Sequence, residues 1–98
     1  MTDKVFRLGD RRYKADSGWA DDAKQYINNV SAVSSDKGGY IYLLQRSDPF
    51  MLIFNTDGKL VDQWSNKEIT DAHYLDFSPK GEVFVVERDN HRIVVFSR

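Results

Sequence analysis

The sequence has 98 residues, of which 41% are hydrophobic and 30% are charged, and this composition predicts one small globular domain. Fourteen basic against fifteen acidic residues give a net charge of -1, so we expect neither nucleic acid nor a membrane as a partner. No stretch has the apolar length of a signal peptide or a membrane span, which favours a cytoplasmic protein. The absence of cysteine excludes disulfides and thiolate metal sites, so a metal would need His, Asp or Glu.

The first part of the chain is predicted to contribute one strand. We expect residues 1–20 to hold an isolated outer strand near Tyr13 to Trp19. Asp21 to Ile27 could form a single helical turn, but its weak apolar pattern favours a loop.

Short β-rich segments fill the rest of the chain in two predicted units, 30–65 and 73–98. The first unit contains the turn sequence Asn55-Thr56-Asp57-Gly58, followed by a polar edge strand from Lys59 to Trp64. In the second unit, Tyr74 to Ser78 alternates, and Pro79-Lys80-Gly81 turns the chain. Val83 to Val86 and Ile93 to Phe96 are apolar at consecutive positions, so we expect both faces of these strands to be covered.

The two units repeat one another. Residues 38–54 align with residues 81–96 at an offset of 42, which places Gly39 on Gly81 and Phe54 on Phe96. Upstream of this block, Val30 to Ser34 is matched to Tyr74 to Ser78, and Trp19 to Trp64 at a spacing of 45. A period of this length predicts sheet units whose neighbours bury one another's faces.

Several motifs accompany this repeat: Asp89-Asn90-His91-Arg92-Ile93-Val94-Val95-Phe96, Ser78-Pro79-Lys80-Gly81, and Phe54-Asn55-Thr56-Asp57-Gly58-Lys59 followed by Trp64. With them, the sequence resembles the NHL-repeat family of six-bladed β-propellers. The order Gly9-Asp10, Tyr13, Trp19, Arg46-Ser47-Asp48-Pro49, Ile53-Phe54 and Ala72-His73 is most similar to bacterial relatives of peptidyl-α-hydroxyglycine amidating lyase. The resemblance implies an all-β fold with two four-stranded propeller blades per chain.

The predicted blade boundaries do not coincide with the ends of the sequence, because the second blade (73–98) lacks its outer strand and the strand in residues 1–20 belongs to neither blade. A pair of blades leaves apolar faces open to water, so we expect copies of the chain to associate. The six blades that the resemblance implies favour a homotrimer, in which each N-terminal strand completes a neighbour's blade. A four-bladed dimer, or a piece of a longer protein, are the alternatives.

Three residues are candidate ligand-binding residues. The resemblance implies that His73 precedes an innermost strand and faces the central channel, where three copies from three chains could bind zinc; a capping role in the strand is the alternative. Asp71 could then accept a hydrogen bond from the other ring nitrogen. Arg46 aligns with an arginine that binds the substrate carboxylate in the lyases, and Arg88 is its equivalent in the second unit. Pairing of Arg88 with Glu87 or Asp89 is the structural alternative.

We therefore expect a propeller-type scaffold that binds a small molecule, an ion or a peptide at the central channel. A metal-dependent lyase or hydrolase with a zinc site built from symmetry-related His73 residues is the alternative, and a purely structural or oligomerisation module is another. The aligned position for the lyases' catalytic tyrosine is Arg88, and Tyr74 replaces a glycine beside His73, which favours the scaffold over the enzyme. Asn90 and Arg92 are expected to be structural, Asn90 with a positive φ and Arg92 in an ion pair between blades.

Overall fold

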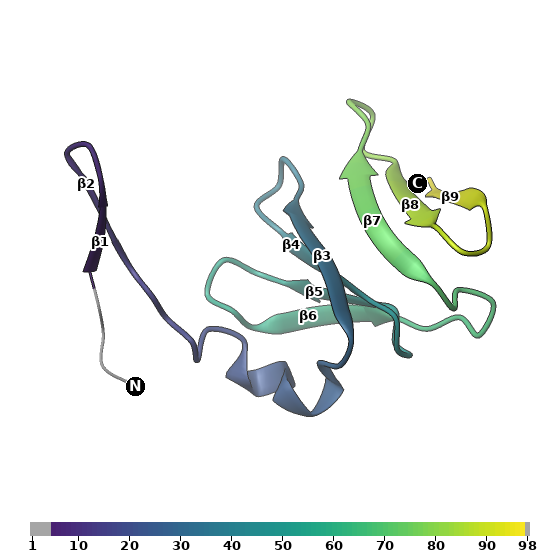
Figure 1. Cartoon of the computed structure of the whole chain (residues 1–98), viewed down its shortest axis with the longest axis horizontal. Coiled ribbons are helices and arrows are strands. Elements are labelled where there is room, and N and C mark those ends of the chain that lie inside the picture. The colour runs from purple at the N-terminus through teal and green to yellow at the C-terminus, as the bar shows by residue number, and fades with distance from the viewer. Residues whose placement is uncertain (1–4, 98) are drawn as a thin grey trace.

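The computed structural model describes residues 5–97, and the fold is all-β with three antiparallel sheets (Figure 1). The first sheet is a hairpin of β1 (Val5–Leu8) and β2 (Arg11–Lys14). The second contains, in spatial order, β3 (Val30–Ser35), β4 (Ile41–Gln45), β5 (Met51–Phe54) and β6 (Leu60–Trp64). The third contains β7 (Ala72–Phe77), β8 (Val83–Glu87) and β9 (Arg92–Phe96). The all-β prediction is confirmed, and the second unit has one strand fewer than the first, as expected from the sequence.

The turn between β5 and β6 illustrates how the sequence sets the strand order. The side-chain oxygen of Asn55 accepts hydrogen bonds from the backbone N–H groups of Asp57 (2.9 Å) and Lys59 (3.0 Å). Gly58 has a φ of +83°, a backbone conformation that glycine adopts without steric cost. This turn reverses the chain and aligns β6 against β5.

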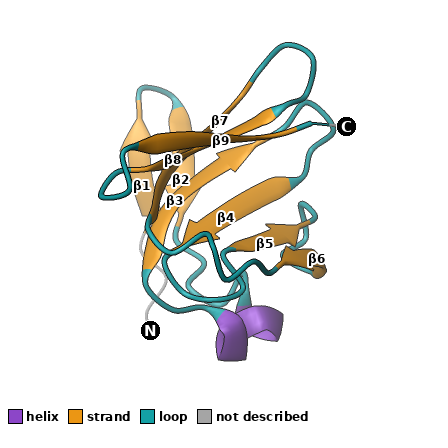
Figure 2. Ribbon diagram, turned by 90° about the vertical axis from the view of Figure 1, so that its right-hand side faces the viewer, coloured by secondary structure: helices purple, strands orange, loops and turns teal. Residues whose placement is uncertain are grey.

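The segment after the hairpin is a helix, so the predicted loop is wrong. Residues Asp21–Tyr26 form the 3-10 helix η1, which lies below β5 and β6 in Figure 2. Ala23 is fully buried and packs in one cluster with Leu52 and Phe54 of β5. The helix forms because this contact buries an apolar side chain, which compensates for the weak helical pattern of the segment.

The main core lies between the second and third sheets, where β3 and β7 run side by side (Figure 1). The ring of Tyr42 meets that of Phe77 edge-on, with centroids 4.8 Å apart. The fully or nearly fully buried members of this core are Leu44, Phe50, Met51, Ile53, Ile69, Ala72, Leu75, Val83 and Val85. Apolar side chains from both sheets thus form one core, as the repeat predicts.

Two equivalent tryptophan contacts connect the successive units. The ring centroid of Trp19 lies 5.3 Å from that of Phe54, and the centroid of Trp64 lies 5.3 Å from that of Phe96. Phe54 and Phe96 are the last residues of β5 and β9, which occupy the same position in their sheets. The matching of Trp19 with Trp64 from the sequence therefore corresponds to the same packing in both units.

The structure corrects the upstream part of the sequence alignment. Val30 pairs with Gln45 at the start of the second sheet, and Ala72 pairs with Glu87 at the start of the third. Val30 is therefore equivalent to Ala72 and not to Tyr74, and the offset of 42 holds throughout both sheets. A β-bulge follows at the same place in both sheets, between Val30 and Ala32 and between Ala72 and Tyr74, so the bulge is itself part of the repeat.

Strand β9 is not covered on both faces, so the prediction for Ile93 to Phe96 is wrong. Ile93 and Val95 in β9 are 63% and 46% exposed, whereas all four residues of the equivalent β5 are buried. Met51 and Ile53, the equivalents of Ile93 and Val95, face the core that the second sheet shares with the third. Within residues 5–97 no further sheet follows the third one to cover Ile93 and Val95 in the same way.

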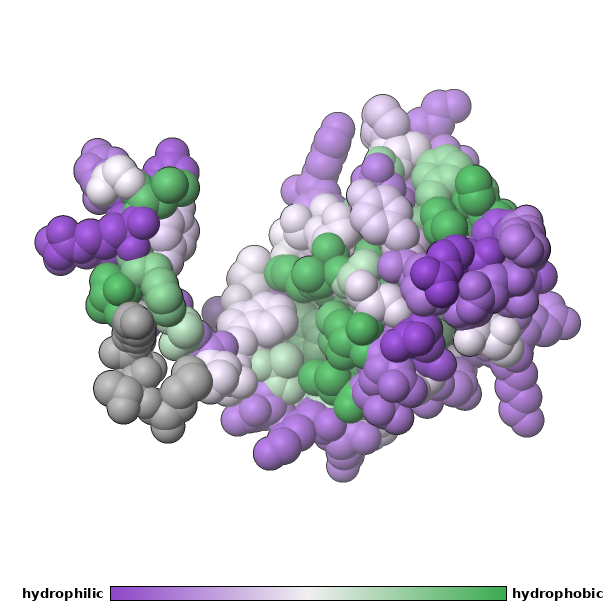
Figure 3. Space-filling view, in the orientation of Figure 1, coloured by the Kyte–Doolittle hydropathy of each residue, from purple (hydrophilic) through white to green (hydrophobic). Residues whose placement is uncertain are grey.

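The N-terminal segment also differs from its prediction, since it forms the β1–β2 hairpin in place of a single strand near Tyr13 to Trp19. All eight strand residues of this hairpin are exposed, and Figure 3 shows it standing apart from the body of the molecule. Its exposed apolar side chains are Val5, Phe6, Leu8 and Tyr13.

Within residues 5–97, none of the helical segments has the length and apolar character needed to cross a membrane.

Candidate functional site

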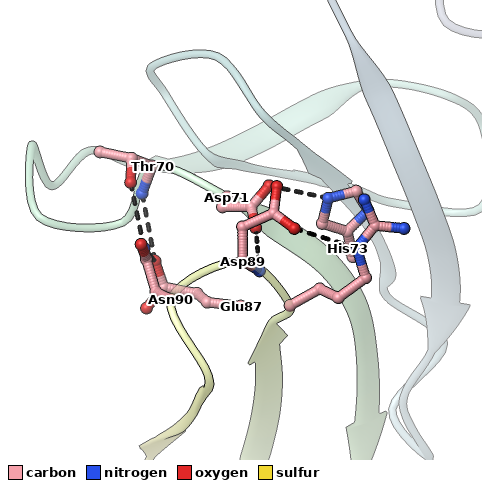
Figure 4. Close-up of polar contacts among 7 residues, drawn as sticks. Thr70, Asp71, His73, Glu87, Asp89 and Asn90 are labelled. Atoms are coloured by element: carbon pink, nitrogen blue, oxygen red, sulfur yellow. Dashed lines mark hydrogen bonds and ion pairs between the residues drawn. The ribbon is translucent and has the colours of Figure 1, made fainter.

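The candidate site lies where the chain enters β7 and where it turns from β8 to β9. Figure 4 shows Thr70, Asp71 and His73 from the β7 entry beside Glu87, Asp89 and Asn90 from the turn. The two segments are 17 to 20 residues apart in the sequence and are joined by side-chain hydrogen bonds. The site is therefore built within one sheet of one chain.

His73 is the extra residue of the β-bulge between Ala72 and Tyr74. Its Nε2 atom lies 2.7 Å from Oδ1 of Asp71, and the two side chains are 25% and 14% exposed. The Asp71 carboxylate therefore fixes the orientation of the imidazole ring, as the sequence predicted. Tyr74, which follows His73, is 58% exposed and is available to contact a partner or ligand beside it.

Asp71 also holds the β8–β9 turn in place. Its second oxygen, Oδ2, accepts a hydrogen bond from the backbone N–H of Asp89. Burial alone would raise the pKa of the Asp71 carboxyl, but the hydrogen bonds from Asp89 and His73 lower it below its ordinary value. Asp71 is therefore a carboxylate, with its negative charge beside His73.

Arg88 and Asp89 extend the site toward solvent. Nε of Arg88 lies 3.2 Å from Oδ1 of Asp89, and their side chains are 70% and 66% exposed. The pairing of Arg88 with a neighbouring acid, one of the alternatives from the sequence, is thus present. An exposed pair of this kind is weak, so both groups are available to a ligand. The shared neighbours Asp71 and Asp89 bring His73 and Arg88 into the same site.

The buried centre of this network is Glu87, which the sequence did not identify as a site residue. Its side chain is fully buried, and its oxygens accept hydrogen bonds from the Thr70 backbone N–H (3.2 Å), Asn90 Nδ2 (3.0 Å) and Arg92 Nε. Burial opposes ionisation, but these hydrogen bonds and the charge of Arg92 together lower the pKa of Glu87 below its ordinary value.

The roles of Asn90 and Arg92 are structural, with details that differ from the predictions. Asn90 donates to Thr70 Oγ1 (3.2 Å) and to Glu87, and the positive φ of the turn belongs to His91 at +53°. Arg92 pairs with Glu87 of its own sheet and donates to the backbone oxygen of Glu68. Arg92 therefore fixes the entry to β7 and does not form an ion pair between the two sheets.

The second sheet contains a neutral version of the same network. Gln45 takes the place of Glu87, and its Oε1 accepts a hydrogen bond from the Asn28 backbone N–H at 3.1 Å. Asn29 takes the place of Asp71 and donates to Oγ of Ser47 at 3.0 Å. Ser31 takes the place of His73 at the bulge. The hydrogen-bonded arrangement is thus shared by both sheets, but the carboxylates of Asp71, Glu87 and Asp89 and the imidazole of His73 are replaced by neutral amide and hydroxyl groups in the second sheet.

Arg46 occupies the position of Arg88 in the second sheet, directly after β4. Its side chain is exposed, and its backbone N–H donates to the oxygen of Asn29 at 3.0 Å. Among the described residues, the Arg46 side chain forms no hydrogen bond or ion pair with His73, so one chain combines His73 with Arg88 but does not add Arg46 to them.

A cleft of about 920 Å³ opens between the two sheets, beyond the opposite end of β7. It is lined by aromatic rings that pack on one another, including Tyr42 on Phe77 and Trp64 on Phe96. The cleft contains none of Arg46, His73 and Arg88. We assign it to the packing between the sheets, because its apolar rings already contact one another and its polar groups lie at exposed turns.

The fold and site define an all-β protein of repeated antiparallel sheets with a polar site at one end of β7, the first strand of the third sheet. Comparisons with protein-family models, curated proteins and solved structures find no significant match. The NHL-repeat and amidating-lyase resemblance therefore stays a prediction based on the sequence motifs.

Proposed function

We propose that the chain is a self-assembling binding scaffold of the propeller type. Copies of the chain would close a ring by covering one another's sheet edges and bind a small molecule, ion or peptide at the end that carries His73. The observation that supports this most is the edge of β9, beside which residues 5–97 place no further strand. The equivalent strand in the second sheet, β5, has a fourth strand beside it, which indicates what kind of element belongs there.

The β1–β2 hairpin is the proposed donor of the missing strand. Its two strands pair with one another, and it exposes Val5, Phe6, Leu8 and Tyr13. Strand addition at an open edge satisfies backbone hydrogen bonds and buries such side chains together. Ile93 and Val95 of β9 are exposed on the face that corresponds to Met51 and Ile53 of β5, so the sheet of a neighbouring copy would cover them in the assembly.

The ligand-binding end is the second part of the proposal. Arg46 and Arg88 occupy equivalent turns after β4 and β8, and both are exposed. In a closed ring, equivalent turns of all sheets lie at the same end, so the guanidinium groups would surround the channel mouth there. Guanidinium groups bind carboxylates with two parallel hydrogen bonds, which favours a ligand with an anionic group.

Light scattering after gel filtration tests the assembly. With 11.4 kDa per chain, we expect a trimer of about 34 kDa, and a four-bladed dimer would instead have about 23 kDa. A folded monomer of 11.4 kDa at micromolar concentration would contradict the closed ring and leave the exposed β9 edge without this explanation.

Removal of the hairpin tests its role as the donor. We expect a chain lacking residues 1–14 to lose the assembled mass, because the β9 edge of each copy would lose its added strand. This deletion spares Trp19, which packs on Phe54 within the same chain. The matched variant is Val95→Lys, since Val95 is 46% exposed and a lysine there would place a charge in the contact with the neighbouring copy without filling the core. An unchanged mass for both variants would show that the hairpin and the β9 edge do not form the contact.

A further inference from the structure

The third sheet gathers three metal-ligating side chains within one chain. One ligand atom from each of Asp71, His73 and Asp89 lies within 4.8 Å of the other two. The three residues come from the β7 entry and the β8–β9 turn, which the buried Glu87 network connects. One imidazole nitrogen and two carboxylate oxygens are ligands for borderline divalent cations such as Zn²⁺.

The neutral network of the second sheet shows that the frame does not require these charges. At the same three positions it has Asn29, Ser31 and Ser47, and the Asn29 to Ser47 hydrogen bond joins the same two segments. The chain therefore forms this bulge and turn twice, once with neutral side chains and once with two carboxylates and a histidine.

We propose that Asp71, His73 and Asp89 of a single chain bind one Zn²⁺-like divalent cation. The ion takes the place of the proton between Nε2 of His73 and Oδ1 of Asp71, and the neutral ring then holds its proton on Nδ1. Asp89 reaches the ion by leaving Arg88, and their exposed ion pair costs little to break. Water fills the remaining positions, because His73 and Asp71 are only partly buried.

This site makes a divalent cation the ligand of the proposed scaffold. A role for the bound ion in the ring rests on that proposed function. Its ligands nevertheless all come from one chain. The expected stoichiometry is therefore one ion per chain, in contrast to one ion per three chains for a site shared by three His73 residues.

Equilibrium dialysis of the full chain against Zn²⁺, with metal measured by elemental analysis, tests the inference. We expect one Zn²⁺ per chain for the natural sequence. The variant Asp71→Asn, His73→Ser, Asp89→Ser transfers the neutral set of the second sheet to the third, and we expect it to bind at least tenfold more weakly. Because the second sheet folds with that set, the melting temperature without metal should change little.

His91→Ser is the matched control, because His73 and His91 are the only two histidines of the chain and His91 lies on the exposed turn. We expect this variant to keep one Zn²⁺. If the triple variant fails to fold, His73→Gln alone should produce the same loss. Binding of one ion per three chains, equal binding by His73→Gln, or no binding by the natural chain would each overturn the single-chain site.

The assembled mass of the same samples separates this inference from the proposed function. An assembled chain without Zn²⁺ would overturn the metal site and leave the scaffold intact. A monomer that binds one Zn²⁺ would support the metal site and contradict the ring.

Discussion

Replacement of Gly58 by alanine is expected to destabilise the protein strongly. An added Cβ would lie 1.9 Å from the backbone oxygen of Trp19, so the segment that carries Trp19 would have to move away from Phe54. The positive φ of +83° adds a penalty of about 1–2 kcal/mol for any residue with a Cβ. With about 1–3 kcal/mol for overpacking, we expect a total loss of about 3 kcal/mol in the free energy of unfolding, measured by urea denaturation.

Gly39→Ala is the matched control for this prediction. Gly39 also has a positive φ, +88°, but the nearest atom to an added Cβ is Cγ2 of Thr56 at 3.8 Å. We expect a loss of about 1 kcal/mol, from the backbone conformation alone. Equal losses for Gly58→Ala and Gly39→Ala would contradict the close approach of Trp19 to the β5–β6 turn.

The second large effect is expected at Glu87. Replacing Arg92 by phenylalanine removes the cation that neutralises this fully buried carboxylate, so we expect a marked loss of stability at neutral pH. Adding Glu87→Gln should restore most of that loss. The double variant reproduces the pair Gln45 and Phe50, which occupies the same two positions in the second sheet. Thermal unfolding of both variants and the natural chain measures the difference in stability. If Glu87→Gln does not restore the stability lost through Arg92→Phe, the two sheets are not equivalent at these positions.

The same carboxylate sets a pH dependence. The pKa of Glu87 is lower in the folded protein than its ordinary value of 4.5, so its contribution to stability is present above about 4.5. This contribution is lost as the pH falls through the lowered folded pKa. Glu87→Gln should therefore flatten the fall of stability below about pH 4.5, as measured by urea denaturation at several pH values. An unchanged acid profile would contradict the charged state of Glu87.

The strand order was predictable because local signals fixed it. The turn from Asn55 to Gly58 combines a side chain that accepts backbone hydrogen bonds with a residue that adopts a positive φ. The consecutive apolar residues Val83 to Val86 predicted a strand covered on both faces, and in β8 these four residues are buried or half-buried. The spacing of 42 between the units was predictable for the same reason, since both contain the same sequence of turns.

The candidate site was predictable only in part. The contact between Asp71 and His73 followed from their separation by two residues on an extended segment. Glu87 was missed because its role depends on partners from Thr70 to Arg92, and no local pattern in the sequence marks a buried acid. The helix η1 was missed for a similar reason, because Ala23 is buried by β5, which lies much further along the chain.

The stacking of each tryptophan on the next sheet has a consequence for dividing or extending the chain. Trp64 lies on the last strand of the second sheet but packs on Phe96 of the third, and Trp19 reaches Phe54 in the same way. The covalent boundary of a sheet and the boundary of its packing therefore do not coincide. A recombinant repeat cut between β6 and β7 would separate Phe96 from its tryptophan, and a cut just before Trp64 would break β6 and its pairing with Met51. A shortened chain that contains the third sheet should therefore retain β6 as well, so that Trp64 stays on Phe96.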